Sequence, residues 1–516
     1  MLELRCCCAT SCRLAGAGRL RRALAQVAHR RGAGPEVLRI KPVGCLRLCS
    51  GGPLLAVASH GSSRALFGAV PPAQAPSLLA WALGEPLEPG EAAALQARRI
   101  ALDDPFFALQ QTVVLEGCGV VDPTSIDDAL AHGTYSQLQR CRSTLSPEQV
   151  RAQIRQSGLR GRGGAGYPTG LKWDTVALQP TGPRQVVCNA DEGDPGAFMD
   201  RAVLEGDPHR LLEGLAIAAY AVGAQRATVY VRAEYPLAIR RLRRAVAQAQ
   251  AKRVLDLELQ VRVGAGAYVC GEETALIASI EGRRGIPRPR PPYPAQHGLA
   301  GQPTLINNVE TLAAVPAIVR RGAAWYSAIG PASSPGTKVF SLSGAVARTG
   351  LIEVPIGTPL RQVVLTMAAG ADGHGGIKAV QIGGPSGGCI PASALDTPLA
   401  DAALRRLGAR LGSGGMVVVG AATAMPELAR YFMRFCANES CGQCVPCRAG
   451  TVQLEQMLAR IGEQGASAAD LAALEQLCTM VASTSLCGLG QAAPNPVLST
   501  LRHFRQEYLV PSGGGP

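Results

Sequence analysis

The sequence predicts a multidomain α/β protein that ends in a helical bundle carrying an iron–sulfur cluster. A chain of 516 residues is too long for one hydrophobic core and should form several domains. Between residues 96 and 334, short strands alternate with helical segments, which is the pattern of a three-layer α/β domain. Near the C-terminus, three closely spaced cysteines precede a distant fourth one, and the segments around them are helical.

The composition of the chain argues against a membrane-spanning or secreted protein. The most apolar stretches, residues 211–224 and 416–425, are too short for a membrane span, and the first of them contains Glu213. The chain has 17 cysteines, and its N-terminus has no apolar secretory signal. Such cysteine usage is typical of a reducing compartment, where thiols bind metals rather than form disulfides. We therefore predict a cytoplasmic protein without a membrane span.

The positive charge is concentrated at the N-terminus. The net charge is +13, and residues 1–50 hold ten Arg and Lys against two acids. A nucleic-acid-binding arm is one interpretation of this bias. Residues 1–50 contain no aromatic side chain on which a base could stack, which disfavours it. A solvated face, or a docking surface for an acidic partner subunit, agrees better with the composition.

Residues 1–95 are predicted to form a small α/β domain with a helix near residues 14–31 and strands at 37–42 and 54–58. Prolines near its end mark a linker to the next domain.

Four cysteines of this domain have a spacing that suits iron–sulfur ligands. Cys7 and Cys12 form a C-x₄-C pair, and Cys45 and Cys49 form a C-x₃-C pair. Four thiolates suffice for a [2Fe–2S] cluster. The alternative is a cluster-free domain with spare cysteines. The neighbouring Cys8 also leaves the register of the first pair open, although only Cys7 gives the x₄ spacing.

A glycine-rich loop occupies residues 158–173 and has a formal G-x-G-x-x-G pattern at Gly161, Gly163 and Gly166. The dinucleotide fingerprint requires a strand before this pattern and a helix straight after it. Here a helical segment precedes the loop, and no helix is expected directly after Pro168. We interpret the loop as a cradle whose backbone approaches a flat ring or a phosphate. Interleaved apolar residues disfavour the alternative of an exposed flexible loop.

Acidic and amide side chains gather where predicted strands end. At the carboxyl edge of an α/β sheet, such groups lie where ligands bind. A solvated turn or a cation site is the alternative for the acids in 191–194, and ordinary helix capping is the alternative for the acids at 272–273. Amide groups at a helix start suit an anion such as phosphate. The residues are Asp191, Glu192 and Asp194 after the strand 185–188, Glu272 and Glu273 after the strand 257–263, and Asn307, Asn308 and Thr311 at a helix start.

The pattern of strands and helices separates three further regions. Residues 96–334 form the three-layer domain, residues 335–422 a small α+β domain, and residues 423–516 a helical bundle. The remaining predicted elements are the strand 227–231 and helices 147–157, 210–222, 237–250 and 273–281 in the first region, strands 339–341, 350–354, 379–382 and 415–419 with a helix near 360–368 in the second, and helices 426–436, 450–461 and 468–482 in the third.

The strongest single motif is C-x₂-C-x₂-C at Cys441, Cys444 and Cys447, with Cys487 as a distant fourth cysteine. Three thiolates from one tight loop can bind three irons of a cube, and the fourth completes a [4Fe–4S] site. The alternative is zinc, which usually takes paired C-x₂-C units and fits this spacing less well. Other cysteines, including Cys188, Cys270, Cys436 and Cys478, are interpreted as buried small apolar residues.

Five ordered motifs together resemble one family over about residues 100–505. They are segments 158–173, 189–196, 264–274, 307–311 and 439–448. The family comprises the FMN- and NADH-binding flavoprotein subunits of respiratory complex I, NAD-linked molybdenum formate dehydrogenases and bidirectional hydrogenases. The first 95 residues are similar to a thioredoxin-like [2Fe–2S] ferredoxin. The resemblance also implies that residues 335–422 are a ubiquitin-like domain.

The resemblance implies specific binding residues. FMN would be bound by Gly161, Arg162, Gly163, Lys172, Asn189, Asp191, Glu192, Tyr268, Gly271, Glu272, Asn307, Asn308 and Thr311. NAD(H) would stack on the flavin near Gly164, Tyr167, Asp194 and Glu273. Clusters would bind at Cys441, Cys444, Cys447 and Cys487, and at Cys7, Cys12, Cys45 and Cys49. No side chain is then needed as an acid or base, because the cofactors carry the redox chemistry.

The branch of the family is predicted from two departures and from the domain content. Tyr167 and Asp194 replace the Phe and Glu usual in complex I, which favours the formate dehydrogenase and hydrogenase branches. One fused [2Fe–2S] domain, with no C-terminal ferredoxin domain expected, favours the β subunit of a soluble NAD-dependent formate dehydrogenase. Its partners would be a molybdenum-containing α subunit and a small [2Fe–2S] γ subunit. Complex I and an NAD-reducing hydrogenase are alternatives, and a non-enzymatic metal-binding scaffold is the alternative of another class.

Overall fold

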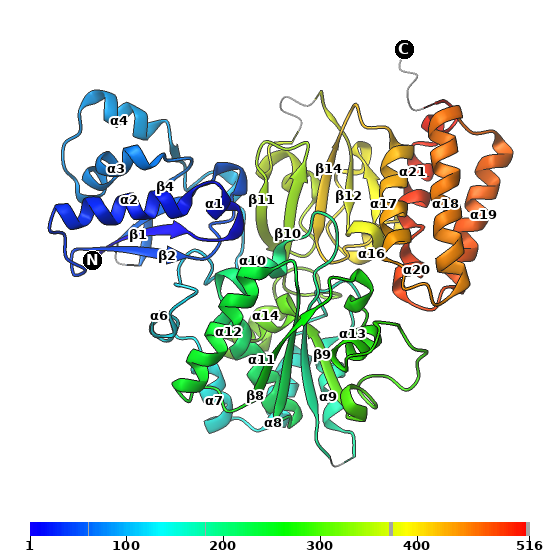
Figure 1. Cartoon of the computed structure of the whole chain (residues 1–516), viewed down its shortest axis with the longest axis horizontal. Coiled ribbons are helices and arrows are strands. Elements are labelled where there is room, and N and C mark those ends of the chain that lie inside the picture. The colour runs from blue at the N-terminus through cyan, green and yellow to red at the C-terminus, as the bar shows by residue number, and fades with distance from the viewer. Residues whose placement is uncertain (60, 181, 371–374, 512–516) are drawn as a thin grey trace.

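The computed structural model describes residues 1–59, 61–180, 182–370 and 375–511. Figure 1 shows three sheets and a helical region, with the N-terminal sheet at one end of the molecule and the C-terminal helices at the other. The prediction of a multidomain α/β fold with a helical C-terminal region is confirmed. Over the described residues, no helix combines the length and the apolarity that a membrane crossing requires.

The N-terminal sheet has the strand order β2-β1-β3-β4-β5. Strand β1 pairs parallel with β2 and antiparallel with β3. Because β5 pairs with β4, this sheet continues past the predicted boundary at residue 95. The elements are β1 (Leu2–Cys7), α1 (Thr10–Leu14), α2 (Ala17–Arg30), β2 (Leu38–Val43), β3 (Leu55–Ser59), β4 (Ser62–Phe67), α3 (Ala75–Leu83), α4 (Pro89–Gln96) and β5 (Arg99–Ile100).

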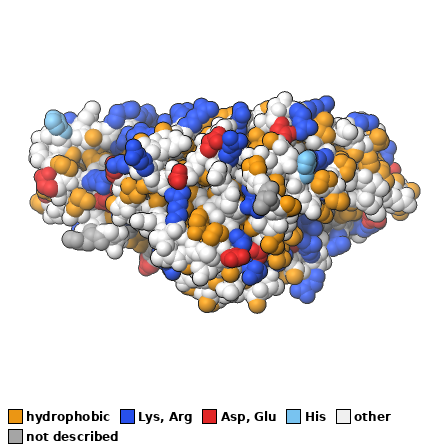
Figure 2. Space-filling view, turned by 90° about the horizontal axis from the view of Figure 1, so that it is seen from below, with side chains coloured by type: hydrophobic (Ala, Val, Ile, Leu, Met, Phe, Trp, Pro, Cys, Tyr) orange, Lys and Arg blue, Asp and Glu red, His pale blue; other side chains and the backbone are white. Residues whose placement is uncertain are grey.

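Two of the basic residues counted in the N-terminal charge excess are buried. Arg5 is paired with Glu3 at 2.7 Å, and Lys41 is paired with Asp128 at 2.7 Å. A buried charge requires such a partner, so these two cations do not belong to a solvated face. Figure 2 shows other Lys and Arg side chains spread along one face, with acidic and apolar side chains between them.

The second sheet is parallel and has the order β8-β7-β6-β9. The chain order reverses between β6 and β9, and ligands of open α/β sheets bind at such a point, beyond the carboxyl ends of the strands. The strands are β6 (Gln185–Ala190), β7 (Arg226–Arg232), β8 (Glu258–Gly264) and β9 (Thr304–Asn308). The helices are α5 (Pro105–Ala108), α6 (Ile126–Ala131), α7 (Ser136–Thr144), α8 (Pro147–Gln156), α9 (Thr169–Ala177), α10 (Met199–Gly206), α11 (Pro208–Val222), α12 (Pro236–Ala251), α13 (Glu273–Ile280), α14 (Val309–Arg321) and α15 (Ala323–Ser327).

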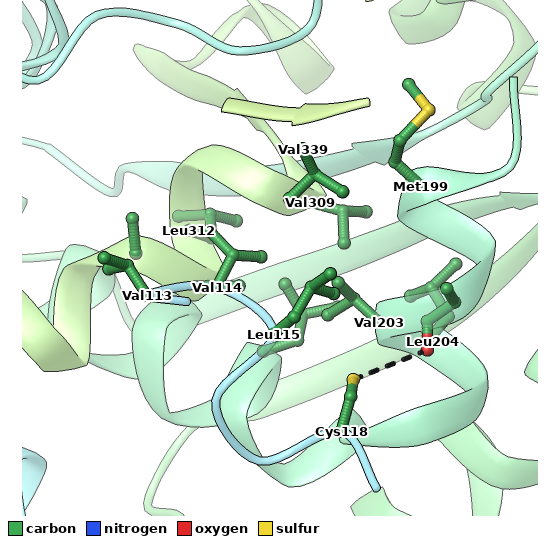
Figure 3. Packing of buried hydrophobic residues seen from close by; sticks show 14 of the residues in the cluster. Val113, Val114, Leu115, Cys118, Met199, Val203, Leu204, Val309, Leu312 and Val339 are labelled. Atoms are coloured by element: carbon green, nitrogen blue, oxygen red, sulfur yellow. Dashed lines mark hydrogen bonds between the residues drawn. The ribbon is translucent and has the colours of Figure 1, made fainter. Parts of the chain in front are cut away.

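One buried cluster connects the N-terminal sheet, the parallel sheet and the third sheet. It gathers side chains from segment 113–118, helix α10 and helix α14 (Figure 3). The buried carboxylate of Glu353 accepts hydrogen bonds from the backbone N–H groups of Val113, Val114 and Leu115 at 2.9–3.0 Å. The three sheets therefore share a core, and this sharing limits how independently each can fold.

The third sheet is mixed and has the order β11-β10-β14-β12-β13. A π-helix at Gln362–Met367 occupies most of the helix predicted at residues 360–368. The sequence analysis missed β13 and α16, which are both short. The elements are β10 (Thr337–Gly344), β11 (Gly350–Pro355), β12 (Ile377–Ile382), β13 (Gly388–Pro391), α16 (Asp401–Arg406) and β14 (Gly415–Gly420).

The C-terminal region is helical, as predicted. Pro426 lies in the first turn of α17, where its missing N–H costs no hydrogen bond. Helix α18 begins at Val445, five residues before the predicted start, so its first turn includes Cys447. The helices are α17 (Met425–Glu439), α18 (Val445–Gln464), α19 (Ala468–Thr484), α20 (Gly488–Ala492) and α21 (Asn495–His503).

Candidate functional site

The glycine-rich loop connects α8 to α9. The backbone N–H of Gly161 donates to the carbonyl of Tyr167 at 2.9 Å and closes the loop. The expectation that no helix follows directly was wrong, because α9 begins at Thr169, one residue after Pro168. Pro168 has φ −59°, a value compatible with the start of a helix. A helix rather than a strand precedes the loop, so the dinucleotide fingerprint is still incomplete.

The loop backbone lies against the end of strand β9. A Cβ atom added to Gly163 would lie 3.0 Å from the Cβ atom of Asn308, and Gly164 has φ +113°. Side chains at these positions would crowd or strain the loop. The Arg162 guanidinium donates instead to the carbonyl of Pro335 at 2.6 Å and to the Tyr326 hydroxyl at 3.1 Å. Arg162 therefore supports the loop, and the glycine backbone is what the loop offers to a ligand.

Asp191, directly after strand β6, differs from the other acids of the site in being buried without a hydrogen-bond partner among the described residues. It is 7 % exposed, and neither of its oxygens has a hydrogen-bond partner among the described residues. Its nearest cation is Arg232, whose Nε lies 3.9 Å from Oδ1. Burial raises the pKa of Asp191 to about 7, despite the opposing effect of Arg232. A buried polar group without a partner is costly unless a ligand supplies the missing donors.

The backbone around Asp191 is fixed by Asn189. The Asn189 side chain accepts from the N–H of Asp191 at 3.1 Å and donates to the carbonyl of Gly271 at 2.9 Å. Gly271 ends a short 3₁₀ turn, Tyr268–Gly271, that follows β8. The carboxyl ends of β6 and β8 are therefore joined at one side of the candidate site.

Two of the predicted acidic residues are occupied by internal hydrogen bonds. Glu192 accepts from the backbone N–H groups of Asp200 and Arg201 at 2.9 and 3.0 Å, at the start of α10. Glu272 accepts from those of Thr274 and Ala275 at 2.9 and 3.0 Å and caps α13. Carboxylates are stabilising at helix N-termini. For Glu272 the helix-capping interpretation is confirmed, and Glu192 caps a helix that the sequence did not predict.

Asp194 and Glu273 lie at the same edge of the sheet. Asp194 accepts a hydrogen bond from the Tyr268 hydroxyl at 2.8 Å and another from the Ser413 hydroxyl. Glu273 forms an ion pair with Lys172, whose Nζ also donates to the carbonyl of Ile306 at 2.7 Å. Tyr167 is half exposed. The charge of Lys172 is thus balanced by Glu273 in the structure.

The two amide residues that end β9 connect the loop to the sheet. Asn307 accepts from the indole N–H of Trp173 at 2.9 Å, and Asn308 caps α14 through the N–H of Glu310 at 2.9 Å. The Thr311 hydroxyl accepts from the backbone N–H of Arg162 at 2.9 Å. The three predicted polar groups and the glycine loop therefore meet at one edge of the parallel sheet.

Sequence reasoning missed three residues of this site. Arg232 ends β7 and donates to the carbonyl of Glu192 at 2.9 Å, and the Tyr235 hydroxyl donates to the Glu192 carboxylate at 3.0 Å. Arg232 is the last residue of a strand and Tyr235 follows it closely, so attention to strand ends could have found both. Ser413 comes from the loop before β14, and only the tertiary fold brings it to Asp194.

The four C-terminal cysteines lie together. Cys441 and Cys444 are in the loop between α17 and α18, Cys447 is in the first turn of α18, and Cys487 precedes α20. Burial raises the pKa of Cys447 to about 11, and the three neighbouring thiols add to this effect. Within the described ranges, no three His, Cys, Asp or Glu side chains converge on a position for a single ion. A cube of four irons instead requires a larger cage of thiolates.

The cysteine loop contacts the flank of the parallel sheet. The Glu439 carboxylate accepts from the backbone N–H of Tyr268 at 2.8 Å, and the rings of Tyr268 and Phe435 lie 5.2 Å apart. Arg284 donates to the carbonyl of Cys441 at 2.9 Å. Tyr268 therefore touches both Asp194 and the helix that leads into the cysteine loop, so the two candidate sites adjoin.

The four N-terminal cysteines surround a small cavity. Cys7, Cys12, Cys45 and Cys49 all line it. Interactions with the thiols of Cys12 and Cys45 lower the pKa of Cys7. Cys8 is directed elsewhere, since its thiol donates to the carbonyl of Val43 at 2.8 Å and accepts from Arg241 at 2.9 Å. We call Cys7, Cys12, Cys45 and Cys49 the front thiols.

The cysteines predicted to be apolar core residues are all buried; they are Cys188, Cys270, Cys436 and Cys478.

Known proteins share these regions. Residues 154–317 match the Nuo51 FMN-binding domain, and residues 427–510 match the NADH-ubiquinone oxidoreductase-F iron–sulfur binding region. The NADP-reducing hydrogenase subunit HndC of Solidesulfovibrio fructosivorans is 48% identical over 408 residues, which are 77% of this chain and 83% of that protein. An NADH-quinone oxidoreductase subunit of Rhizobium meliloti is 43% identical over 409 residues, 78% of this chain and 97% of that protein.

The likeness extends to solved structures. The crystal structure of an NAD⁺-reducing [NiFe]-hydrogenase in the H₂-reduced state has a chain that matches 98% of this chain with a TM-score of 0.68 and 33% identity, over 83% of its own length. The site and these similarities define an oxidoreductase subunit with an FMN-binding domain and a [4Fe–4S]-binding region. The chain belongs to the family of NADH-binding FMN and iron–sulfur subunits typified by Nuo51.

Proposed function

We propose that this chain is a diaphorase subunit that transfers electrons between NAD(H) and iron–sulfur clusters through FMN bound at the edge of the parallel sheet. The observation that carries the proposal is Asp191, a buried carboxylate that has no hydrogen-bond partner among the described residues and lies beside Gly271, at the sheet edge where the glycine loop meets Asn308. FMN, when bound, exchanges electron pairs with nicotinamide and single electrons with clusters. The contact between Tyr268 and Glu439 supports a short path from this site to the cysteine loop.

The proposed roles follow from the contacts. Gly161, Gly163 and Gly271 would let the backbone approach FMN, and Asp191 would accept its hydrogen bonds. A second group of residues would hold the backbone around FMN in place, because their side chains already form hydrogen bonds to neighbouring segments of the site. They are Asn189, Asn307, Asn308, Thr311, Arg162, Glu192 and Glu272. Gly164, Tyr167, Asp194 and Glu273 would lie beside NAD(H), with Lys172 paired to Glu273 and Tyr268 paired to Asp194.

Replacing Asp194 by Asn should weaken NADH binding with little effect on FMN content. Asp194 receives hydrogen bonds from Tyr268 and Ser413, and a neutral amide cannot accept at both oxygens. Loss of one charged hydrogen bond predicts about a tenfold rise in the apparent KM for NADH. Steady-state dye reduction measures KM, and the absorbance of the purified protein measures FMN. A variant that loses FMN but keeps its KM would assign Asp194 to the flavin instead.

The front thiols are proposed to hold a [2Fe–2S] cluster, with Cys7 rather than Cys8 as the fourth ligand. Cys45→Ala in the full chain should remove two irons per chain and the corresponding reduced-cluster signal, because one iron loses a ligand. Iron analysis and electron paramagnetic resonance check this result, with Cys8→Ala as the control that keeps its iron. Unchanged iron in Cys45→Ala would reject the cluster. The full chain is needed, since residues 198–205 supply part of the cavity wall.

We also propose the fold families of two of the domains. The N-terminal sheet would be the thioredoxin-like domain, and the third sheet would be the ubiquitin-like domain. The mixed strand orders of the two sheets and the likeness to a hydrogenase chain over 98% of this chain support both assignments.

For the terminal enzyme, we propose a hydrogenase as the partner complex. The support is the likeness to HndC and to the chain of the NAD⁺-reducing [NiFe]-hydrogenase. A molybdenum formate dehydrogenase, with its α and γ subunits, stays the second candidate because Tyr167 and Asp194 favour both branches. Reduction of NAD⁺ by H₂ in the intact complex purified from its native host would support the first, and reduction by formate would replace it with the second.

A further inference from the structure

Helix α10 supplies one wall of the cavity that the front thiols surround. Phe198, Arg201, Ala202 and Glu205 line the cavity together with Cys7, Cys12, Cys45 and Cys49. These wall residues belong to the domain of the parallel sheet, more than a hundred residues away in sequence. The front thiols therefore face the flavin-binding domain and are covered by it.

Arg201 is the arginine that helix α10 places at the cavity. Among the residues that the structure describes, its guanidinium forms no ion pair and no hydrogen bond, in contrast to most arginines of this domain. It lies over the rings of Phe198 and Tyr235, with Cζ 5.6 and 5.5 Å from the ring centroids. Two aromatic faces favour the charged form and restrict its position. The two rings thus hold the positive charge at the cavity, and no carboxylate among the described residues forms an ion pair with it.

The helix that carries Arg201 is fixed at both ends. At its start, Glu192 accepts from the N–H groups of Asp200 and Arg201 and also from the Tyr235 hydroxyl. At its end, the buried Glu205 accepts from the backbone N–H and the hydroxyl of Thr10 at 2.8 and 2.6 Å. Thr10 lies between the front thiols Cys7 and Cys12. These contacts hold Arg201 at a set position relative to the front thiols.

Arg241 reinforces the same junction from helix α12. It donates to the carbonyl of Cys8 at 2.9 Å and to the carbonyl of Glu205. Its donors are therefore used between the two domains. Arg47 of the N-terminal domain also lines the cavity and donates to the Gln110 side chain at 3.0 Å. Arg201 is the cation that the domain of the parallel sheet contributes to the cavity lining.

We propose that Arg201 sets the reduction potential of the cluster at the front thiols, an inference that rests on the proposed [2Fe–2S] site. One-electron reduction of a cluster adds a negative charge inside a cavity of low dielectric constant. A fixed cation stabilises that added charge more strongly there than in water. Cluster potentials respond to net charge and solvent exposure in this way. Arg201 acts on the cluster through its field and is not a ligand.

The test compares full-length holoprotein variants by redox titration with electron paramagnetic resonance. In Arg201→Met the potential of the front cluster should shift to a more negative value, whereas Arg201→Lys, which keeps the charge, should restore most of the wild-type potential. Arg243→Met is the matched control, because Arg243 is an exposed arginine on α12 and its replacement removes the same net charge. Its front cluster should titrate like the wild type, and the [4Fe–4S] signal should be unchanged in all variants.

The results that would overturn the role of Arg201 differ from those that would reject the [2Fe–2S] cluster. Arg201→Met with full iron content and the wild-type potential would overturn the role of Arg201 and leave the [2Fe–2S] proposal intact. An equal shift in Arg243→Met would also overturn it, because the effect would then be one of net charge. A wild-type chain without iron at the front thiols would reject the [2Fe–2S] proposal and this inference with it. If Arg201→Met loses its iron, Arg201→Gln takes its place, and a potential equal to the wild type then overturns the inference.

Discussion

Cys447→Ala is expected to lose the [4Fe–4S] cluster while NADH still reduces the flavin. Cys447 is buried in the first turn of α18, and its thiol lies 3.2 Å from the Ser440 hydroxyl. Without it, three thiolates remain and one iron has no protein ligand. The candidate flavin site contacts the helix before this loop through Tyr268, whose backbone N–H donates to Glu439 and not to the Cys447 thiol, so the hydrogen bonds of the site should persist. Iron analysis should show a loss of four irons per chain, and anaerobic NADH titration should still bleach the flavin absorbance.

Cys478→Ala is the matched control for this experiment. Cys478 is fully buried in the core of the helical region, on α19, and is not predicted to be a ligand. Its loss leaves a small cavity that costs about 1 kcal/mol of stability and should not change iron content. Retention of the reduced-cluster signal in Cys447→Ala would show that the ligand set is wrong. Loss of iron in both variants would indicate that the bundle is unstable and not that a ligand has been removed.

The sequence predicts the two inner strands of the parallel sheet, β6 and β7, well because they are almost wholly buried. Strands β6, β7 and β8 lie within one or two residues of their predicted ends. The interiors of β6 and β7 are apolar and rich in valine, whereas β8 is an edge strand that alternates apolar and polar residues. Strand β9 was missed. It is five residues long and ends in two asparagines, which indicate a helix start more strongly than a strand end. Both descriptions apply, since Asn308 is the last residue of β9 and the cap of α14.

Strand β1 was missed for a different reason. Its sequence contains Glu3 and Arg5, and charged residues in a short segment do not indicate a buried strand. In the structure these two side chains form an ion pair with each other, and Arg5 is 3 % exposed. Pairing of this kind is a property of the folded sheet, so hydrophobic periodicity cannot reveal it.

At the candidate site, too, the sequence indicates where strands end but not which groups the folded chain brings into contact. From the predicted strand ends we expect Asp191, Asp194 and Glu273 at the site, because strand ends can be recognised in the sequence. The sequence alone does not distinguish Asp191, whose oxygens accept no hydrogen bond from the described residues, from Glu192, whose oxygens cap α10. That difference depends on which backbone N–H groups the fold brings near each carboxylate. The α10 wall beside the front thiols is equally a product of tertiary packing.

Asp191→Asn should lower FMN affinity and raise the stability of the flavin-free protein. In the bound state, Asp191 is proposed to accept hydrogen bonds from FMN, and a charged acceptor is worth about 1.5–3 kcal/mol more than none. That difference predicts a loss of affinity of about 10- to 100-fold. In the flavin-free state, the same carboxylate is buried without partners, and a neutral amide costs less to bury. A residue that served only the fold would change both properties in the same direction.

The stability gain should depend on pH with a definite sign. The pKa of Asp191 is raised to about 7 in the folded protein, above its usual value of 3.8. The unfolded chain therefore releases this proton first, and the flavin-free wild type loses stability as pH rises from about 4 to 7, by a few kcal/mol. Asp191→Asn lacks this loss, so its advantage should grow over that range and level off above pH 7. Urea unfolding of the two flavin-free proteins between pH 4.5 and 8 measures the difference.

The control for both measurements is Glu258→Gln, at an exposed carboxylate that pairs with Arg226 on the protein surface. An exposed pair contributes about 0–1 kcal/mol, so this variant should keep its FMN affinity and show no growing advantage with pH. Flavin fluorescence titration gives the affinities. If Asp191→Asn binds FMN like the wild type, Asp191 does not contact the flavin. If it is less stable than the wild type without FMN, then its carboxylate has a protein partner that replaces the ligand, and the site must be assigned to another group.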